Sequence, residues 1–209
     1  MLSRTWWGTV RPEWEVRVSE PDASTLPESD PSWATADDRT LVEACLAGRR
    51  DAFAPIVERH QRHVYQLCYR FVGNHEDASD LTQDVFIRAY RGLKNFKGQS
   101  SLGTWLYRIG VNVCLNRISS KAPRPEPLGD REHLDTRLEH ADTALLRGER
   151  AAAVRAAIAK LPRKQRATLI LRVYHDLRHE EIARILGGSV GAVKANFFHA
   201  LANLRKLMT

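Results

Sequence analysis

The sequence has few cysteines and no pairing pattern among them. Its 209 residues include three, Cys45, Cys68 and Cys114, each among apolar neighbours and none in a C-x-x-C pair. An odd, scattered set argues against a disulfide framework and a zinc site, and it fits a reducing compartment. We expect all three to be small buried hydrophobic residues.

Long apolar runs are also missing from the sequence. No stretch approaches the length of a membrane-spanning helix. The N-terminus lacks the positively charged region and apolar block of a signal peptide. Neither the alternation typical of strands nor a βαβ rhythm occurs. We therefore predict an all-α, cytoplasmic protein with no direct membrane insertion.

What the chain does have is positive charge, unevenly spread. The net charge is +7 and the sequence pI is about 9.6, which favours a polyanionic partner. The first 36 residues are net negative, whereas residues 149–209 carry most of the positive charge. We expect nucleic acid to bind mainly at the C-terminal end.

The first half of the chain contains a tail and a helical stretch. Residues 1–36 hold four prolines and show no periodicity, which predicts a disordered tail. From Asp37 onward, apolar residues recur at spacings of three and four. This pattern predicts helices over about 37–47, 51–72, 76–93 and 104–119. Asp37 and Asp38 are expected to cap the first helix and Thr104 the last.

The second half repeats this organisation after a break. Three prolines fall within residues 121–130 and cannot sit inside a helix, so residues 121–138 are predicted to form a flexible linker. Beyond it, the pattern predicts helices over about 141–160, 163–175, 179–186 and 190–207. The predicted architecture is two small helical domains, 37–120 and 139–209.

The last two predicted helices form a helix-turn-helix pattern. Gly187-Gly188 provides the turn, and Ser189 is expected to cap the longer second helix. We expect that helix to bury Val190, Val193, Phe197, Leu201 and Leu204. Its outward residues, which would enter the major groove, are Gly191, Lys194, Ala195, Phe198 and His199. The alternative is a helical hairpin that touches no DNA.

An acidic face is predicted on the helix over 76–93. Asp77, Asp80 and Asp84 share one side at spacings of three and four, together with Gln83. Like charges so placed cost helix stability, and the helix dipole offsets part of that cost. In a basic chain such a face indicates a basic protein partner, although it could also be only a solvated surface.

A second stripe is predicted on the helix over 104–119. Trp105, Arg108, Asn112 and Asn116 recur at spacings of three and four, next to the loop at residues 94–103. This combination suits unpaired bases: the ring can stack on a base, the amides can hydrogen-bond to base edges and the cation can bind phosphate. The alternative is that Trp105 is a core side chain.

Three stretches, in this order, resemble the extracytoplasmic-function (ECF) RNA polymerase sigma factors. They are DLTQDVFIRAY (Asp80–Tyr90), FKGQSSLGTWLYRIGVNVCLN (Phe96–Asn116) and LPRKQRATLILRVYHDLRHEEIARILGGSVGAVK (Leu161–Lys194). The resemblance covers about residues 37–209, apart from the linker. It implies a region 2-like domain followed by a region 4-like domain.

The resemblance also implies roles by position. Contacts to core RNA polymerase would come from Asp77, Asp80, Gln83, Asp84 and Arg88. The minus-ten element would be melted and read by Phe96, Lys97, Ser101, Thr104, Trp105, Arg108, Asn112 and Asn116, with Asn112 lining the pocket for a flipped base. The minus-thirty-five element would be read by Arg178, Gly191, Lys194, Ala195, Phe198 and His199. Many members have more arginine or lysine at the positions of Ala195, Asn196 and His199, so the grip on phosphate should be weaker here.

The resulting hypothesis is a bacterial alternative sigma factor without covalent chemistry, cofactor or metal. Its expected partners are core RNA polymerase, promoter DNA and an anti-sigma factor, membrane-anchored or not. One alternative is a stand-alone helix-turn-helix regulator, which usually binds a palindrome as a symmetric dimer. The other is a metal-dependent hydrolase using His60 and His63, or His175 and His179, although neither pair has the glutamate of H-E-x-x-H.

Overall fold

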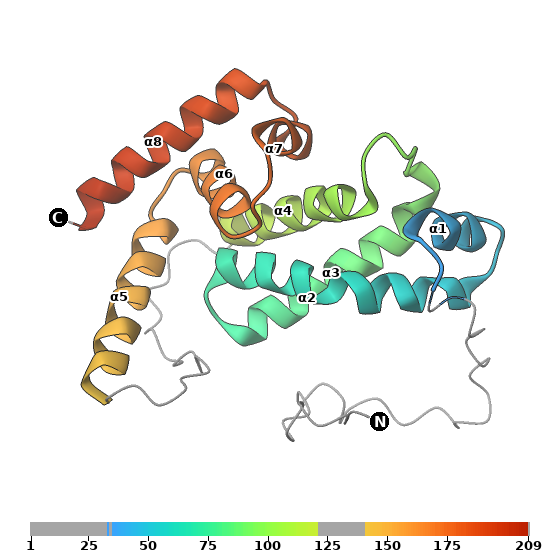
Figure 1. The fold of residues 1–209 in the computed structure, drawn as a ribbon, viewed down its shortest axis with the longest axis horizontal. Helices are drawn as coiled ribbons and strands as arrows, with labels where there is room; N and C mark the ends of the chain where they lie inside the picture. Colours follow the sequence, from blue (N-terminus) through green and yellow to red (C-terminus); the bar gives the residue numbers. More distant parts are fainter. Residues whose placement is uncertain (1–32, 34, 121–140, 209) are drawn as a thin grey trace.

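The protein is all-α over the residues that the computed structural model describes, which are 33, 35–120 and 141–208 (Figure 1). The helices are α1 (Asp38–Leu46), α2 (Phe53–Val72), α3 (His75–Gly92), α4 (Leu102–Ser120), α5 (Ala141–Ala159), α6 (Arg163–Val173), α7 (His179–Leu186) and α8 (Val190–Met208). Two short 3-10 helices are η3 (Arg50–Ala52) and η4 (Leu93–Asn95). The predicted fold class is confirmed. The predicted linker and most of the predicted tail lie outside the described residues.

Local caps explain why the first helices begin and end where they do. The Asp37 carboxylate accepts from the backbone N–H of Thr40 at 2.8 Å, at the start of α1. The Asn74 side chain does the same for Asp77 at 2.8 Å, at the start of α3. Gly73 ends α2 at φ +81°, a left-handed conformation that favours glycine. The helices predicted from the periodicity and these caps therefore match the observed ones closely.

The start of α4 differs from the prediction. Ser101, not Thr104, caps the helix: Ser101 Oγ accepts from the Thr104 N–H at 3.2 Å and lies 2.8 Å from the Thr104 hydroxyl. Thr104 lies inside the first turn and is only 8% exposed. Serine and threonine are both good caps. Burial of Leu102, which draws the helix start toward the core, decides between them.

Residues just before α1 pack on the corner between α1 and α2. Trp33 Nε1 donates to Asp51 Oδ2 at 2.8 Å, and the Arg49 guanidinium lies 5.2 Å from the centre of the Trp33 ring. Hydrogen bonds from Arg49 and Trp33 hold the pKa of Asp51 below its ordinary value. Trp33 is thus part of the folded body.

Helices α1 to α4 form a first module, defined here as residues 35–120. Its largest fully buried side chains are Leu41, Ile56, Val64, Leu67, Phe71, Val85, Leu106 and Val111. Cys68 and Cys114 are buried as predicted, while Cys45 is half-buried. Helix α4 comes close to α2 at Gly110, where a Cβ atom would lie 2.8 Å from Leu67 Cδ2.

This close approach predicts that Gly110→Ala destabilises the protein. Overpacking a core costs about 1 to 3 kcal/mol, and the helix preference of alanine offsets up to about 1 kcal/mol. We expect the free energy of unfolding, measured by urea denaturation, to fall by about 1 kcal/mol. Gly103→Ala in the same helix is the control, because its Cβ would lie an ordinary 3.7 Å from His60 Cε1. Equal stability of the two variants would contradict close packing at Gly110.

Helices α5 to α8 form a second module, defined as residues 141–208. Its core includes Ile170, Leu171, Ile182 and Val193, all at most 2% exposed. On α8 the prediction was wrong at one position: Leu201 is 47% exposed, and Ala200 is buried instead. At 100° per residue, Ala200 points within about 20° of Val193, whereas Leu201 is turned away by about 80°.

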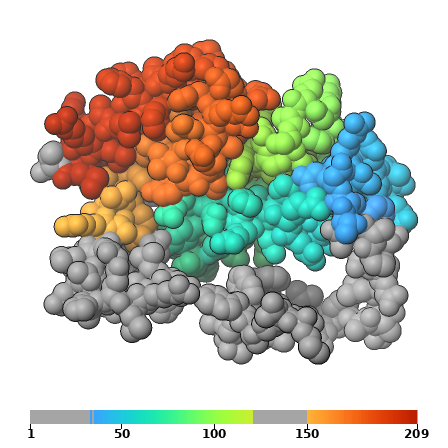
Figure 2. All heavy atoms as spheres, viewed as in Figure 1, coloured from blue at the N-terminus to red at the C-terminus, as the bar shows by residue number. Residues whose placement is uncertain are grey.

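The two modules pack directly against each other. Helix α6 contacts α2, and α7 contacts α4. Figure 1 shows α6 and α7 lying over α4, and Figure 2 shows their surfaces meeting without a break along α4. No helix within the described residues is long and apolar enough to cross a membrane.

Candidate polymerase and nucleic-acid interfaces

The predicted acidic face on α3 is only partly free. Asp77 Oδ1 accepts from Arg117 of α4 at 2.7 Å, and the Asn74 amide donates to its other oxygen at 2.9 Å. This ion pair raises the pKa of Arg117 above its ordinary value. Asp77 therefore ties α3 to α4. Asp84 is paired with Arg88 at 3.2 Å, so the outward face consists of Asp80, Gln83, Asp84 and Arg88.

Beside this face lies an apolar groove that the sequence analysis missed. Ile87 is 47% and Tyr90 44% exposed, and with Phe53, Phe86 and Arg91 they line a groove of about 490 Å³. The Tyr90 ring meets the Phe53 ring edge-on, with 5.0 Å between centroids. Two apolar residues three apart on a polar helix face were the available signal. Acidic residues beside an apolar groove suit a partner helix that is both basic and apolar.

The predicted minus-ten stripe on α4 is mostly exposed. Arg108, Asn112 and Asn116 are exposed and lie one turn apart along the helix. Trp105 is half-buried: its ring packs on Phe96 at 5.3 Å between centroids, and a Cβ atom added at Gly92 would lie 3.7 Å from its Cζ2 atom. Trp105 thus contributes to packing and presents only part of its ring.

The loop before α4 contributes unevenly. Lys97 and Ser101 are exposed, Phe96 is half-buried and Thr104 is buried. Because the hydroxyl groups of Ser101 and Thr104 are hydrogen-bonded to each other, both already take part in capping α4. Of the eight predicted minus-ten residues, Lys97, Arg108, Asn112 and Asn116 are the exposed ones that take no part in this cap.

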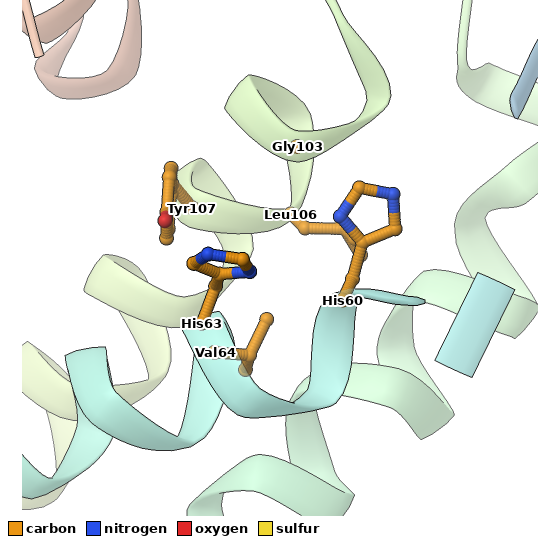
Figure 3. Close-up of a pocket in the computed structure, with 6 residues that line it drawn as sticks. All are labelled: His60, His63, Val64, Gly103, Leu106 and Tyr107. Atoms are coloured by element: carbon orange, nitrogen blue, oxygen red, sulfur yellow. The ribbon is translucent and has the colours of Figure 1, made fainter. Parts of the chain in front are cut away.

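A hollow of about 140 Å³ lies between α2 and α4 (Figure 3). His60, His63, Val64, Gly103, Leu106 and Tyr107 line it. His60 Nε2 is hydrogen-bonded to Asp38 Oδ2 at 2.9 Å. Across residues 33, 35–120 and 141–208, no group of three histidine, cysteine or acidic residues is placed to hold a metal ion. The histidines of the hydrolase hypothesis therefore form no such site in this part of the chain.

The helix-turn-helix is built as predicted. Gly187 adopts φ +66° at the end of α7, and the Gly188 N–H donates to the Ala183 carbonyl at 3.0 Å. Ser189 Oγ accepts from the Ala192 N–H at 3.2 Å and so caps α8. Tight turn and cap together fix the angle between the two helices.

The predicted reading face of α8 is exposed. Gly191, Lys194, Ala195, Phe198 and His199 all face solvent, as does Arg178 at the start of α7. Phe198 is 69% exposed, which is unusual for a ring of that size. Lys194 is the only cation among the outward residues of α8 from Gly191 to His199. The face therefore offers mainly apolar contacts and one positively charged side chain, Lys194.

Comparison with known proteins places both modules. The family model "Sigma-70 region 2" matches residues 56–124, and "Sigma-70, region 4" matches residues 151–204. The RNA polymerase sigma-H factor of Pseudomonas aeruginosa is 34% identical over 180 residues, covering 82% of this chain and 93% of the relative. The ECF RNA polymerase sigma factor SigW of Bacillus subtilis is 34% identical over 174 residues, covering 79% and 93%.

Solved structures agree with this placement. CnrH, solved in complex with the cytosolic domain of CnrY, aligns with a TM-score of 0.61 at 26% identity, covering 82% of this chain and 96% of that one. RpoE of Bartonella quintana, solved with the anti-sigma factor NepR, aligns with a TM-score of 0.53 at 20% identity, covering 75% and 96%; this second likeness supports the fold.

These findings separate the three hypotheses. Both sigma-70 regions occur in one chain, and the curated relatives named above are sigma factors, so neither a stand-alone regulator nor an enzyme accounts for the protein. It is a DNA-binding factor for transcription initiation. The chain belongs to the ECF family of RNA polymerase sigma factors.

Proposed function

We propose that this sigma factor docks on core RNA polymerase through α3, reads the minus-ten element with α4 and reads the minus-thirty-five element with α8. The observation that carries the proposal is the presence of two exposed reading faces, a polar one on α4 and a mainly apolar one with Lys194 on α8, in one chain with an outward acidic face on α3. A sequence-specific regulator would need no third face.

The docking role rests on the outward residues of α3. Asp80, Gln83 and Asp84 offer acceptors to a basic partner, while the neighbouring groove offers apolar area at Ile87 and Tyr90. Charge complementarity speeds encounter and fixes register, whereas apolar burial supplies affinity. Asp77 is not part of this proposed surface, because Arg117 holds it.

The minus-ten role rests on α4. Asn112 and Asn116 can hydrogen-bond to the edges of unpaired bases, and Arg108 and Lys97 can meet phosphates on the same strand. Capture of a flipped base repays its unstacking through contacts that a duplex cannot make.

Control of this protein would come from an anti-sigma factor. RpoE of Bartonella quintana was solved with the anti-sigma factor NepR, and CnrH was solved with the cytosolic domain of CnrY. An anti-sigma factor that covered α3 or α8 here would block polymerase or DNA. Because its proposed partners are polymerase and the chromosome, the protein would act in the cytoplasm.

Transcription in vitro tests the proposal as a whole. Core RNA polymerase, with and without this protein, is given a pool of genomic fragments from the same organism, and the transcript starts are sequenced. We expect starts that depend on the protein and share two upstream elements at fixed spacing. No dependent start, together with symmetric binding to a palindrome, would instead support a stand-alone regulator.

Lys194→Ala tests the reading role of α8. Loss of one phosphate contact should reduce the slope of log affinity against log salt by about 1, and loss of a guanine contact should cost about 1 to 3 kcal/mol. We therefore expect about tenfold weaker binding to a promoter identified as above, measured by fluorescence anisotropy. Lys160→Ala, which removes an exposed cation between α5 and α6, is the control. Equal affinities would place α8 outside the major groove.

A further inference from the structure

Two buried thiols face each other in the core of the first module. Cys68 of α2 and Cys114 of α4 are forty-six positions apart in the sequence, and both are 0% exposed. Their sulfur atoms are close enough to hydrogen-bond to each other. Neither thiol belongs to the proposed docking or reading faces. They are therefore a pair of nucleophilic groups to which the proposed function gives no role.

The close packing of α4 on α2 explains why the two thiols meet. Gly110 brings α4 so near to α2 that a Cβ atom there would lie 2.8 Å from Leu67 Cδ2. Cys68 is the next residue after Leu67 on α2. Cys114 follows Gly110 by four residues, one turn further along the same side of α4. A disulfide needs Cα atoms about 4.4 to 6.8 Å apart, and a glycine at the crossing makes such a separation reachable.

A buried cation lies beside the pair. Arg166 of α6 is 8% exposed, and its guanidinium donates to the carbonyl of Phe71, three residues after Cys68. Its charge favours the thiolate form of Cys114. The hydrogen bond between the two sulfurs lowers the pKa of Cys68 and raises that of Cys114. Because the thiolate is the form that attacks an oxidant, Cys68 is the thiol that reacts first.

We propose that Cys68 and Cys114 form a reversible disulfide when the protein meets hydrogen peroxide, and that this bond weakens melting of the minus-ten element. The Cys68 thiolate attacks one peroxide oxygen, the O–O bond breaks, and the leaving hydroxide takes up a proton to give water. Cys68 is then a sulfenic acid. The Cys114 sulfur attacks the sulfenic sulfur, and the hydroxyl leaves with the Cys114 proton as a second water. Two thiols are oxidised and one peroxide is reduced.

Burial makes this reaction slow. Exposed thiols meet an oxidant directly, whereas buried thiols react only when the fold opens locally. Hydrogen peroxide is small and uncharged, so a brief local opening admits it. The pair therefore responds to sustained exposure to peroxide and stays reduced otherwise, as a reducing compartment requires.

The bond would change the path of α4. The two sulfurs must come to about 2.05 Å from each other. No room for further approach remains at Gly110, so the C-terminal half of α4 has to tilt about that point. Asn112 and Asn116 lie two residues on either side of Cys114 and move with it. This consequence rests on the proposed minus-ten role of α4.

Mass spectrometry of the full chain tests the pairing. The protein carries Cys45→Ser, which removes the half-buried third thiol. After peroxide treatment and alkylation of the remaining thiols, digestion without reductant should give the Cys68 and Cys114 peptides as one linked product with two fewer hydrogen atoms. Dithiothreitol should restore both thiols. Unlinked peptides, whether still reduced or oxidised to sulfinic acids, would overturn the proposal.

Potassium permanganate footprinting tests the effect on melting. The protein is oxidised and freed of peroxide before core polymerase and a promoter from the transcription assay are added. Displacement of the base contacts of Asn112 should lower open-complex formation by about tenfold, and dithiothreitol should restore it. Binding of core polymerase should be unchanged, because the outward face of α3 carries neither thiol.

Cys68→Ala and Cys114→Ala, each in the Cys45→Ser background, are the matched controls. Each retains one of the two thiols, so peroxide should leave its open-complex formation unchanged. A linked protein that melts the promoter as well as the reduced one would overturn the proposed effect, as would an equal loss in both controls. Absence of any transcript with the reduced protein, while the linked peptide still forms, would instead overturn the proposed promoter roles.

Discussion

Reversing the charge of the α3 face, in the double variant Asp80→Lys and Asp84→Lys, is expected to abolish binding of core RNA polymerase. Both residues lie on the outward side of α3, beside the apolar groove at Ile87 and Tyr90. Like charges across an interface cost several kcal/mol, so the affinity should fall by at least about 100-fold. Binding of labelled protein to core polymerase, followed by fluorescence anisotropy, measures this loss.

The control adds the same charge elsewhere. Glu43→Lys with Glu58→Lys changes two exposed glutamates on α1 and α2 and should leave the affinity nearly unchanged. Both double variants should unfold at similar temperatures, because the ion pairs removed are exposed. If the control loses as much affinity as the α3 variant, net charge and not the α3 face governs docking.

Replacing Asn112 with alanine is expected to remove most base discrimination at one position of the minus-ten element. A paired amide contact is worth about 1 to 3 kcal/mol against the wrong base, so formation of open complexes should fall by about 10- to 100-fold. Asn112→Asp keeps the shape but replaces the amide donors with acceptors, so it should shift the preferred base. Potassium permanganate footprinting of promoters that differ at each minus-ten position reads out both effects.

The control for Asn112 is another exposed amide. Gln61 lies on the outer side of α2, so the Gln61→Ala variant should melt every promoter as the wild type does. Should Asn112→Ala bind polymerase normally and retain the wild-type order of base preference, α4 would not read the base at that position. A uniform loss at all promoters would instead point to a general defect in melting.

Helix positions were predictable because their signals are local. Each residue that sets a helix end acts on groups only a few positions away, so the signal can be found in the sequence itself. These residues are Asp37, Gly73, Asn74, Gly187 and Ser189. The choice between Ser101 and Thr104 as the cap of α4 was not predictable, because both residue types can cap a helix and only the packing of the folded protein selects one. The prediction for Leu201 was wrong because a repeated spacing of four drifts away from the buried face: at 100° per residue, Ala200 and not Leu201 stays in line with Val193.

Side-chain partners were much harder to predict. The spacing of the acidic residues grouped Asp77, Asp80 and Asp84 on one face. In the structure, however, Asp77 is paired with Arg117, forty residues away in the sequence. The contact of Arg166 with Phe71 joins residues separated by 95 positions, and nothing in either local pattern indicates it. The face of a helix can be predicted from periodicity, but which other helix or partner meets that face depends on the tertiary fold.

The exposed ring of Phe198 has a consequence for the chemistry of the promoter itself. A ring that packs on a thymine detects a methyl group at C5 and makes no hydrogen bond that would identify the base. A cytosine methylated at C5 carries the same group at the same place in the major groove. If α8 reads the minus-thirty-five element as proposed, enzymatic methylation of one cytosine there should strengthen binding in the wild type and have no effect in Phe198→Ala. The cell's own DNA modification would then act as a second input to the same promoter.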